Sequence, residues 1–375
     1  MDVGIVGCGV LGLAAALELR ARGHAVAVIE RDVVPAAKAA SNDTSKTIQR
    51  LYGQRGLYVE LAERAEAQWR RWQDRVGGAF YFPIGHLLVA RGFDPGTRLH
   101  DSYLALAERS CPPRLLPLAE ARERFPQLAY HPDDVVLFDA WGGYLASGQA
   151  IADLAWLARA DGVQIYERTP VRGVEEVGSR IRILTDTATA EFDRVVVAAG
   201  VWLGDLVPDL RKRLRITRQC MAFFIARDQE RHRPGPLPVW AFDAPGDNWY
   251  GHPLPDGRVK VADNPLGEPA DPDSDRDATP GFAERARAFV ESWLPGLARG
   301  ELVATRSCLY DNTPDADFIV DWAPGTGRVL VAGGGSGHGF KFGGALGPLI
   351  ADALEDRDNP LGARFRLAKR FGLDA

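Results

Sequence analysis

The sequence predicts an α/β fold in which a mainly parallel sheet, assembled from separated parts of the chain, carries an inserted and mostly antiparallel sheet. Three buried strand-like runs support the parallel sheet, at residues 3–6, 193–200 and 328–332. Each run leads into a glycine-containing turn, as strands that precede helices or ligand loops commonly do. Residues 215–264 contain short apolar runs separated by Pro and Gly turns, which indicate antiparallel strands.

A glycine-rich turn connects the first of these strands to a predicted helix. Gly7, Gly9 and Gly12 have G-x-G-x-x-G spacing, and residues 13–22 are rich in helix formers. Gly7 permits a tight turn, Gly9 allows close approach to a pyrophosphate, and Gly12 lets the helix pack on the strand. Glu30 ends the next strand, where it can accept hydrogen bonds from ribose hydroxyls. In this context the pattern predicts a dinucleotide site rather than a purely structural turn.

The acid at the second strand's tip favours FAD or NAD over NADP, but the motif alone leaves FAD and NAD open. Segments typical of a dinucleotide domain lie at residues 1–50, 163–202 and 328–356, with other material between them. This interleaving suits a flavoprotein better than an NAD dehydrogenase. The last glycine-rich turn also opens a helix, whose N-terminus can stabilise negative charge on a reduced flavin ring.

We therefore expect a Rossmann-like FAD-binding domain, discontinuous in sequence, with an inserted substrate domain on a mostly antiparallel sheet. The FAD-binding domain is predicted to comprise residues 1–80, 145–215 and 322–375, and the substrate domain residues 81–144 and 216–321. Thr44 is predicted to cap a short helix that runs through Arg50, and residues 57–74 an amphipathic helix.

Composition excludes several classes of function. Among 375 residues, 50 Asp+Glu against 45 Lys+Arg give a net charge of −5, which argues against a nucleic-acid surface. The four cysteines have no C-x-x-C spacing, so neither a zinc site nor a redox pair is expected, and we predict no metal. We expect no secretory signal and no membrane span, and hence a cytoplasmic protein.

Two long motifs near the C-terminal end resemble a known family. They are Cys308–Asp321 and Gly335–Phe342, and shorter matches lie at Arg218-Gln219, Trp249–Pro253, Val259–Val261 and Tyr52-Gly53. In these motifs the chain resembles monomeric sarcosine oxidase and N-methyltryptophan oxidase, within the D-amino-acid-oxidase-like flavoproteins. The resemblance spans nearly the full length.

The resemblance implies FAD as the cofactor, covalently attached through the sulfur of Cys308. It implies that Lys260 lies beneath the flavin and helps reduced flavin pass electrons to O2, although a lone strand lysine is usually solvated. Lys341 matches a lysine that binds the substrate carboxylate. The implied catalytic residues are Lys260, Lys46, Tyr250, Tyr310, His338 and Lys341. The predicted cofactor-binding residues are Gly7, Gly9, Val10, Leu11, Gly12, Glu30, Arg31, Ser41, Thr44, Lys46, Val171, Gly200, Trp202, Cys308, Gly335, Gly337, His338, Gly339 and Lys341.

The chain also departs from the pattern of the family. Lys46 stands where the family has an arginine over the flavin face, and Gln49 where it has the arginine that pairs with the substrate carboxylate. Arg50 could substitute only if the register slips, and Asn264 replaces a pocket histidine. Because a bidentate clamp is then in question, a larger or less acidic amine, or a cyclic imino acid, is as plausible as a small N-methyl amino acid.

The expected activity is that of a flavin-dependent amine oxidase. A secondary amine, amino acid or cyclic imino acid would be oxidised at its C–N bond to an imine, and O2 reduced to H2O2. The nearest rival is a dehydrogenase of the same fold that passes electrons to another carrier. An NAD-dependent reductase, a binding module that uses FAD structurally, and a tRNA-modifying relative are further alternatives. Expected partners are the small-molecule amine and O2, with no nucleic acid or membrane, and the chain is expected to be a monomer or weak homo-oligomer.

Overall fold

The computed structural model describes residues 1–244, 247–264 and 267–371. Its described strands include a six-stranded sheet in the order β20-β21-β13-β1-β2-β9. All neighbours are parallel except β20, which runs antiparallel to β21. The predicted α/β fold is confirmed. The strands are β1 Asp2–Val6, β2 Ala25–Ile29, β9 Gln164–Tyr166, β13 Arg194–Val197, β20 Ile319–Trp322 and β21 Val329–Gly333.

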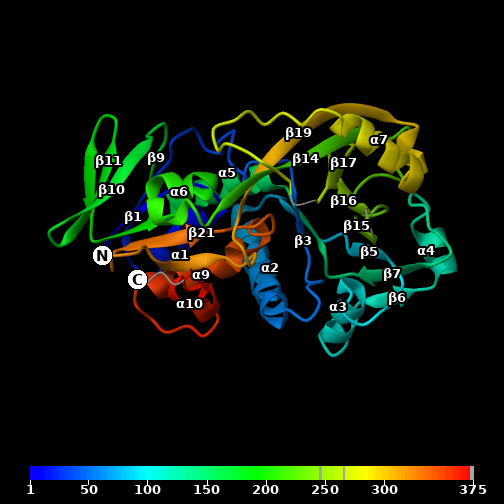
Figure 1. Ribbon diagram of the computed structural model, residues 1–375, viewed down its shortest axis with the longest axis horizontal. Helices are drawn as coiled ribbons and strands as arrows, with labels where there is room; N and C mark the ends of the chain where they lie inside the picture. The colour runs from blue at the N-terminus through cyan, green and yellow to red at the C-terminus, as the bar shows by residue number, and fades with distance from the viewer. Residues whose placement is uncertain (245–246, 265–266, 372–375) are drawn as a thin grey trace.

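Helices cover one face of this sheet, and a small antiparallel sheet lies against the other (Figure 1). Helix α1 packs against α9 and α5, and the approach to α9 is close because a Cβ added at Gly347 would lie 2.7 Å from the carbonyl oxygen of Ala14. The helices are α1 Val10–Ala21, α2 Gly56–Val76, α5 Ser147–Ala160 and α9 Gly343–Leu354, and the small sheet is β10 Val171–Val177, β11 Arg180–Thr185 and β12 Thr189–Phe192.

The larger sheet occupies the other half of the molecule and is antiparallel except where β15 pairs with β5 (Figure 1). Its order is β18-β14-β17-β16-β15-β5-β7-β6, and β19 pairs with β14. The strands are β5 His86–Arg91, β6 Arg114–Leu116, β7 Asp134–Asp139, β14 Arg215–Ile225, β15 Val239–Ala244, β16 Asp247–Pro253, β17 Arg258–Asp263, β18 Glu268–Pro269 and β19 Glu301–Asn312.

The two faces of this larger sheet have different partners. One face packs on helix α7 through residues such as Phe224, Val259 and Val261. Since side chains alternate along a strand, the residues next to these point to the opposite face. Register places Lys260 opposite both His252 and Phe223, and Cys308 opposite Gln219, on that second face. The remaining helices are α3 Arg98–Leu106, α4 Leu118–Arg124, α6 Leu203–Leu206, α7 Phe282–Trp293, α8 Pro295–Ala298 and α10 Ala368–Phe371.

A three-stranded sheet of β3 Lys46–Ile48, β8 Gly143–Leu145 and β4 Tyr81–Phe82 corrects one local prediction. The helix expected from Thr44 through Arg50 is wrong. Lys46–Ile48 instead forms an antiparallel ladder with β8. The side chain of Asp43 accepts the backbone N–H of Thr44 at 2.7 Å, and β-branched Thr47 and Ile48 favour the strand that follows.

The structure supplies two further observations on organisation. β20 belongs to the six-stranded sheet although the predicted boundary at residue 322 assigns most of it to the substrate domain, and the division of the chain stays a prediction. Within the described residues, every helix is too short or too polar to cross a membrane.

Candidate functional site

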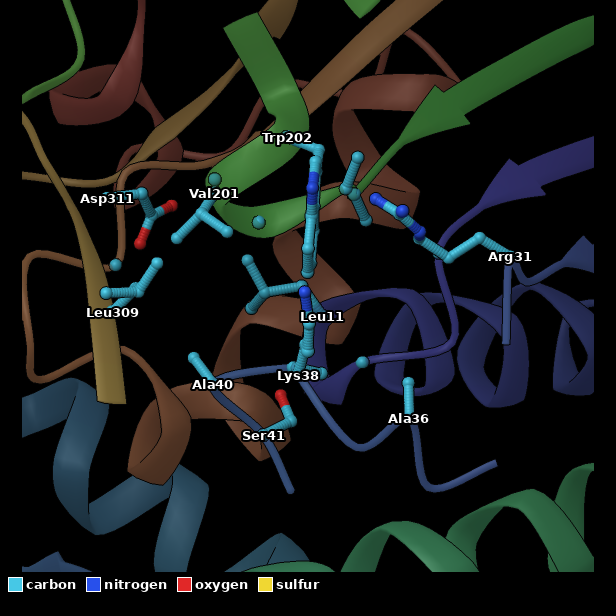
Figure 2. A pocket seen from close by; sticks show the side chains of 18 of the residues that line it. Leu11, Arg31, Ala36, Lys38, Ala40, Ser41, Val201, Trp202, Leu309 and Asp311 are labelled. Atoms are coloured by element: carbon cyan, nitrogen blue, oxygen red, sulfur yellow. The ribbon is translucent and has the colours of Figure 1, made fainter. Parts of the chain in front are cut away.

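An elongated cavity of about 610 Å³ runs between the tip of β1 and strand β19. Figure 2 shows Arg31 at one side of it and Leu309 and Asp311 at the other, with Leu11 between them. The wall includes these predicted cofactor-binding residues: Gly7, Gly9, Val10, Leu11, Glu30, Arg31, Ser41, Lys46, Val171, Gly200, Trp202, Cys308, Gly335, Gly337 and Gly339. Tyr310 also lines the cavity.

The glycine turn at the start of α1 is shaped by close backbone approaches. Gly7 has φ +102°, and a Cβ added there would lie 2.5 Å from the carbonyl oxygen of Ala198. A Cβ at Gly12 would lie 2.0 Å from the carbonyl oxygen of Gly7, so Gly12 supports the turn from behind. The hydroxyl oxygen of Ser41 accepts the N–H of Val10 at 3.1 Å, at the N-terminus of the helix. This end of the cavity therefore presents backbone dipoles and little side-chain bulk.

Glu30 lies at the tip of β2, beside the glycine turn. Its carboxylate accepts the N–H groups of Cys8 at 2.8 Å and Asp32 at 3.1 Å. Burial raises the pKa of Glu30, and the two N–H groups oppose that shift. The carboxylate is thus held in one orientation at the cavity wall, where it can accept a hydrogen bond from a ribose.

A loop from the larger sheet closes over the same end of the cavity. The indole N–H of Trp202 donates to Asp273 Oδ1 at 2.8 Å, and the guanidinium carbon of Arg31 lies 4.6 Å from the centre of the Trp202 ring. Arg31 also pairs with Asp273 at 3.2 Å, and Lys38 donates to the Asp273 carbonyl. Figure 2 shows Trp202 and Lys38 on opposite sides of the cavity.

Buried charges surround the other end of the cavity, near Cys308. The carboxylate of Asp43 accepts from Lys260 Nζ at 2.7 Å and from Lys46 Nζ at 2.9 Å. Lys260 also donates to the carbonyl of Ser45 at 2.9 Å, and Lys46 Nζ lies 3.6 Å from Cys308 Sγ. One carboxylate thus joins a lysine of the larger sheet to a lysine of β3.

Electrostatic interactions within this cluster shift the pKa values of Asp43 and Lys46. Burial alone would raise the pKa of Asp43, but Lys260 and Lys46 hold that pKa well below its usual range. Burial alone would lower the pKa of Lys46, but Asp43 more than offsets it, so the pKa of Lys46 lies above its usual range. The carboxylate of Asp43 and the ammonium of Lys46 therefore stay ionised as a pair next to the thiol.

Lys341 is a further buried lysine, and the residues that the structure describes supply it with no such carboxylate partner. Lys341, in the 3-10 turn Phe340–Phe342 before α9, donates to the hydroxyl of Tyr52 at 3.1 Å and to the carbonyl of His338 at 3.0 Å. Burial, then Arg98 and Lys46, lower the pKa of Lys341 to about 7. Burial, then Lys341, lower the pKa of His338 to about 3, so this imidazole is neutral.

The neutral imidazole fixes a direction of hydrogen bonding. His338 Nε2 lies 2.9 Å from the carbonyl of Ala316, so Nε2 carries the proton. Nδ1 then accepts from the hydroxyl of Tyr52 at 3.3 Å, and the Tyr52 oxygen accepts from Lys341. The chain Lys341–Tyr52–His338–Ala316 is consistently oriented, which leaves a proton of Lys341 for a ligand.

The sequence matches a known protein family over nearly its whole length. A model of a family described as FAD dependent oxidoreductase matches residues 2–353. The chain belongs to the FAD-dependent oxidoreductase family. The N-methyl-L-tryptophan oxidase of Yersinia pestis (strain Pestoides F) is 28% identical over 374 residues, covering 98% of this chain and 99% of that protein.

Solved structures of two proteins share the fold of this FAD-dependent oxidoreductase. NikD, an unusual amino acid oxidase essential for nikkomycin biosynthesis, superposes in its open form with a TM-score of 0.83 and 23% identity, covering 97% of this chain and 96% of that one. L-proline dehydrogenase from P. horikoshii gives a TM-score of 0.87 and 18% identity, covering 100% and 99%. The predicted family resemblance is confirmed.

The geometry of this FAD-dependent oxidoreductase suits its cofactor. A glycine turn, an acid at the tip of β2 and a helix N-terminus lie at one end of a long cavity, and a buried thiol lies at the other. Other predicted site residues lie outside the cavity lining in the described structure: Gly12, Thr44, Tyr250, Lys260, His338 and Lys341. Thr44 borders a separate shallow pocket with Asp43 and Gln149.

The structure of this oxidoreductase settles the register that the sequence left open. Arg50 is fully buried and pairs with both carboxylate oxygens of Asp139 at 3.1 Å and with Glu63 at 3.1 Å, so it points away from the cavity. The side-chain carbonyl of Gln49 accepts the N–H of Leu51. Asn264 is exposed at the end of β17. Arg50 therefore does not substitute for the arginine absent at position 49.

Sequence reasoning missed three polar residues of this oxidoreductase's site. Asp43 and Tyr52 lie in the segment already aligned with the family, but no motif marks them as partners of lysines. Arg98 begins helix α3, and its Nε donates to the carbonyl of Leu51 at 3.0 Å. Spacing could not find Arg98, because it belongs to a segment that carries no recognisable motif. A useful signal would have been the basic side chain at the start of a helix that packs on residues 51–53.

Proposed function

We propose that this FAD-dependent oxidoreductase is an amine oxidase that acts on the C–N bond of a secondary amine, amino acid or cyclic imino acid, with O2 as electron acceptor. The observation that carries the proposal is the set of buried lysines around the cavity end that holds Cys308. N-methyl-L-tryptophan oxidase, matched over nearly its whole length, supports the substrate class. When bound, FAD would supply the two-electron acceptor for the reaction.

The side chains contribute positioning and electrostatics. A positive environment from Lys341 and Lys46 favours the neutral, deprotonated form of a bound amine, which is the form that can be oxidised at the adjacent carbon. Tyr310, whose pKa is raised by burial and by the neighbouring Tyr250 hydroxyl, stays neutral and can donate a hydrogen bond. Lys260 would stabilise negative charge that develops when O2 is reduced.

Cys308 is our proposed point of covalent attachment for FAD. Its thiol is 5% exposed, lines the cavity and lies 3.6 Å from the ammonium of Lys46. Sulfur reacts as the thiolate. The thioether would fix the flavin ring next to Tyr310.

Acid precipitation tests this attachment. Wild-type protein should keep its yellow colour in the pellet, whereas Cys308→Ser should release the colour into the supernatant. Cys220→Ser, on the opposite face of the same sheet, is the matched control and should behave as wild type. Colour released from wild type would contradict covalent attachment.

One observation favours the rival function, a dehydrogenase that passes electrons to a carrier. Lys260 makes two hydrogen bonds, one of them to the carboxylate of Asp43, and this negative charge weakens the lysine as a site for superoxide. The oxidase would therefore rely on the donor capacity that Lys260 keeps beside these two hydrogen bonds.

A panel of secondary amines, amino acids and cyclic imino acids would separate the two functions. Each compound should be scored for H2O2 in air and, without oxygen, for reduction of a dye. An oxidase produces one H2O2 per imine. Imine formation that needs the dye and yields no H2O2 would identify the dehydrogenase. An absence of flavin colour in the purified protein would exclude both the oxidase and the dehydrogenase.

A further inference from the structure

Two cations outside the cavity lining, Lys341 and Arg98, lack a carboxylate partner among the residues that the structure describes. Lys341 is 6% exposed, and its hydrogen bonds within the described chain go to a hydroxyl and a carbonyl. Arg98 is partly buried, and its one hydrogen bond in the described structure is from Nε to the carbonyl of Leu51. Among the residues that the structure describes, no acid lies within 4.0 Å of either group. The terminal nitrogen atoms of Arg98 therefore remain available to a ligand.

The two cations are anchored to adjacent residues of one segment. Arg98 is tied to Leu51, and Lys341 is tied to Tyr52, the next residue along the chain. Helix α3, which begins with Arg98, is fixed to the same segment because Ser102 accepts the N–H of Gly53 at 2.8 Å. The positions of Arg98 and Lys341 are thus coupled through residues 51–53.

The electrostatics agree with this placement. Burial lowers the pKa of Arg98, and the positive charge of Arg98 is the largest contribution after burial to the lowered pKa of Lys341. Asp243 on β15 acts on Arg98 only from beyond ion-pair distance. Like charges repel strongly where water is excluded, so this pair is unfavourable until an anion joins it.

The segment that carries Lys341 leads directly from the cavity lining. Lys341 directly follows Gly339 and Phe340, which line the cavity. Tyr250 packs against the same apolar cluster as Leu51 and Tyr52. The position that the family resemblance assigns to a carboxylate-binding arginine holds Gln49, which is turned onto its own backbone.

We propose that Arg98, together with Lys341, forms the anion site that binds the carboxylate of the substrate. Arg98 offers two parallel N–H donors to the carboxylate, and Lys341 adds a single charged donor. The substrate class then narrows to amino or imino acids and excludes simple amines. This inference rests on the proposed amine oxidation, because it assigns a role to the anion within that reaction.

The test uses binding of an unreactive probe, so that it does not depend on turnover. Cyclopentanecarboxylate carries the anion and lacks the nitrogen, and cyclopentanecarboxamide is its neutral counterpart of similar shape. Calorimetry on the flavin-loaded protein should show that wild type binds the carboxylate at least roughly tenfold more tightly than the amide.

Arg98→Met should abolish most of that preference while leaving the weak binding of the amide unchanged. Arg98→Lys keeps the charge and loses the paired donors, so it should restore only part of the preference. Arg64→Gln, at an exposed position of α2 where Arg64 pairs with Glu60, is the control and should bind as wild type does.

Equal binding of the two probes, absence of carboxylate binding, or an unchanged preference in Arg98→Met would overturn the inference. A protein that oxidises no amine but prefers the carboxylate through Arg98 would reject the proposed function and keep the anion site. If the protein oxidises neutral amines as well as amino acids and Arg98→Met has no effect, the proposed function is supported and the anion site is rejected.

Discussion

The two ends of the cavity are formed by different parts of the polypeptide, backbone groups at one end and side chains at the other. At the end near β1 and α1, the shape comes from backbone groups and missing side chains, as Gly7 and Gly12 show. At the end near Cys308, the properties come from long polar side chains such as Lys46 and Lys260, which come from different sheets and meet at Asp43. The first end is local in sequence, whereas the second requires the whole fold to be assembled.

This difference predicts which substitutions each end of the cavity tolerates. A backbone site fails when atoms are added, because there is no room for them. A site of buried charges fails when atoms are removed, because a partner is left uncompensated. The following experiments test that contrast, beginning with the loss of the cofactor and ending with a shift in Tm.

Adding one methyl group at Gly12 should abolish flavin retention. The new Cβ would lie 2.0 Å from the carbonyl oxygen of Gly7, and the backbone must move to relieve the contact. We expect Gly12→Ala to retain at least about tenfold less flavin, which corresponds to about 1.4 kcal/mol. The ratio of flavin absorbance to protein absorbance measures it, and circular dichroism reports whether the fold persists.

Gly56→Ala is the matched control for that experiment. It adds the same methyl group at the start of α2, where no atom lies within 4 Å of the new Cβ. It should retain flavin as wild type does. Equal retention by Gly12→Ala and Gly56→Ala would show that the tight turn does not limit the first end.

Removing the charge of Asp43 should destabilise the second end. Asp43→Asn leaves Lys260 and Lys46 facing each other without a carboxylate, and loss of one partner from a buried ion pair costs about 3–5 kcal/mol. Thermal denaturation should show a clearly lower Tm. Asp186→Asn, which breaks the exposed pair with Arg172, should leave the Tm unchanged. Similar effects of the two variants would remove the distinction between the cluster and the surface.

Replacing Lys341 should stabilise the fold. The pKa of Lys341 is about 7 in the folded protein and 10.5 when unperturbed, so the unfolded chain binds more protons between these values and stability rises with pH across them. Below pH 7 the burial penalty is present in full. Lys341→Met should therefore raise the Tm by roughly 2 to 4 °C at pH 6.

The gain from Lys341→Met should shrink as the pH rises from 7 toward 10, because wild type is then relieved of its buried charge. Lys212→Met, at an exposed position, should show no pH-dependent difference. A gain that is equal at pH 6 and pH 9.5 would mean that Lys341 is already neutral at pH 6.

The same contrast explains how far the sequence could predict the structure. The glycine turn, Glu30 and the buried strands could be predicted from the sequence, because each depends on residues close in sequence. The wall of the cavity also includes most of the predicted cofactor-binding positions, whose role stays a prediction.

The contacts at the second end of the cavity could not be predicted from the sequence in this way. The link from Asp43 to Lys260 joins residues more than two hundred positions apart, and β3 appears only because β8 offers a partner. Arg50 shows the limit most clearly. Its sequence position suggested the cavity, whereas its buried pairing with Asp139 directs it elsewhere. Local patterns do not encode which acid a buried base will meet.

Ion pairs between residues distant in sequence also fix the last described residues, at the buried carboxylate of Asp317. Asp317 accepts from Tyr58 and Arg55 and pairs with Arg364, while the carbonyl of its neighbour Ala316 fixes the tautomer of His338. In homologous chains we therefore expect covariation, with the arginines and aspartates of this clasp exchanged in pairs. The clasp comprises Arg364–Asp317, Arg366–Asp321 and Arg370–Asp315.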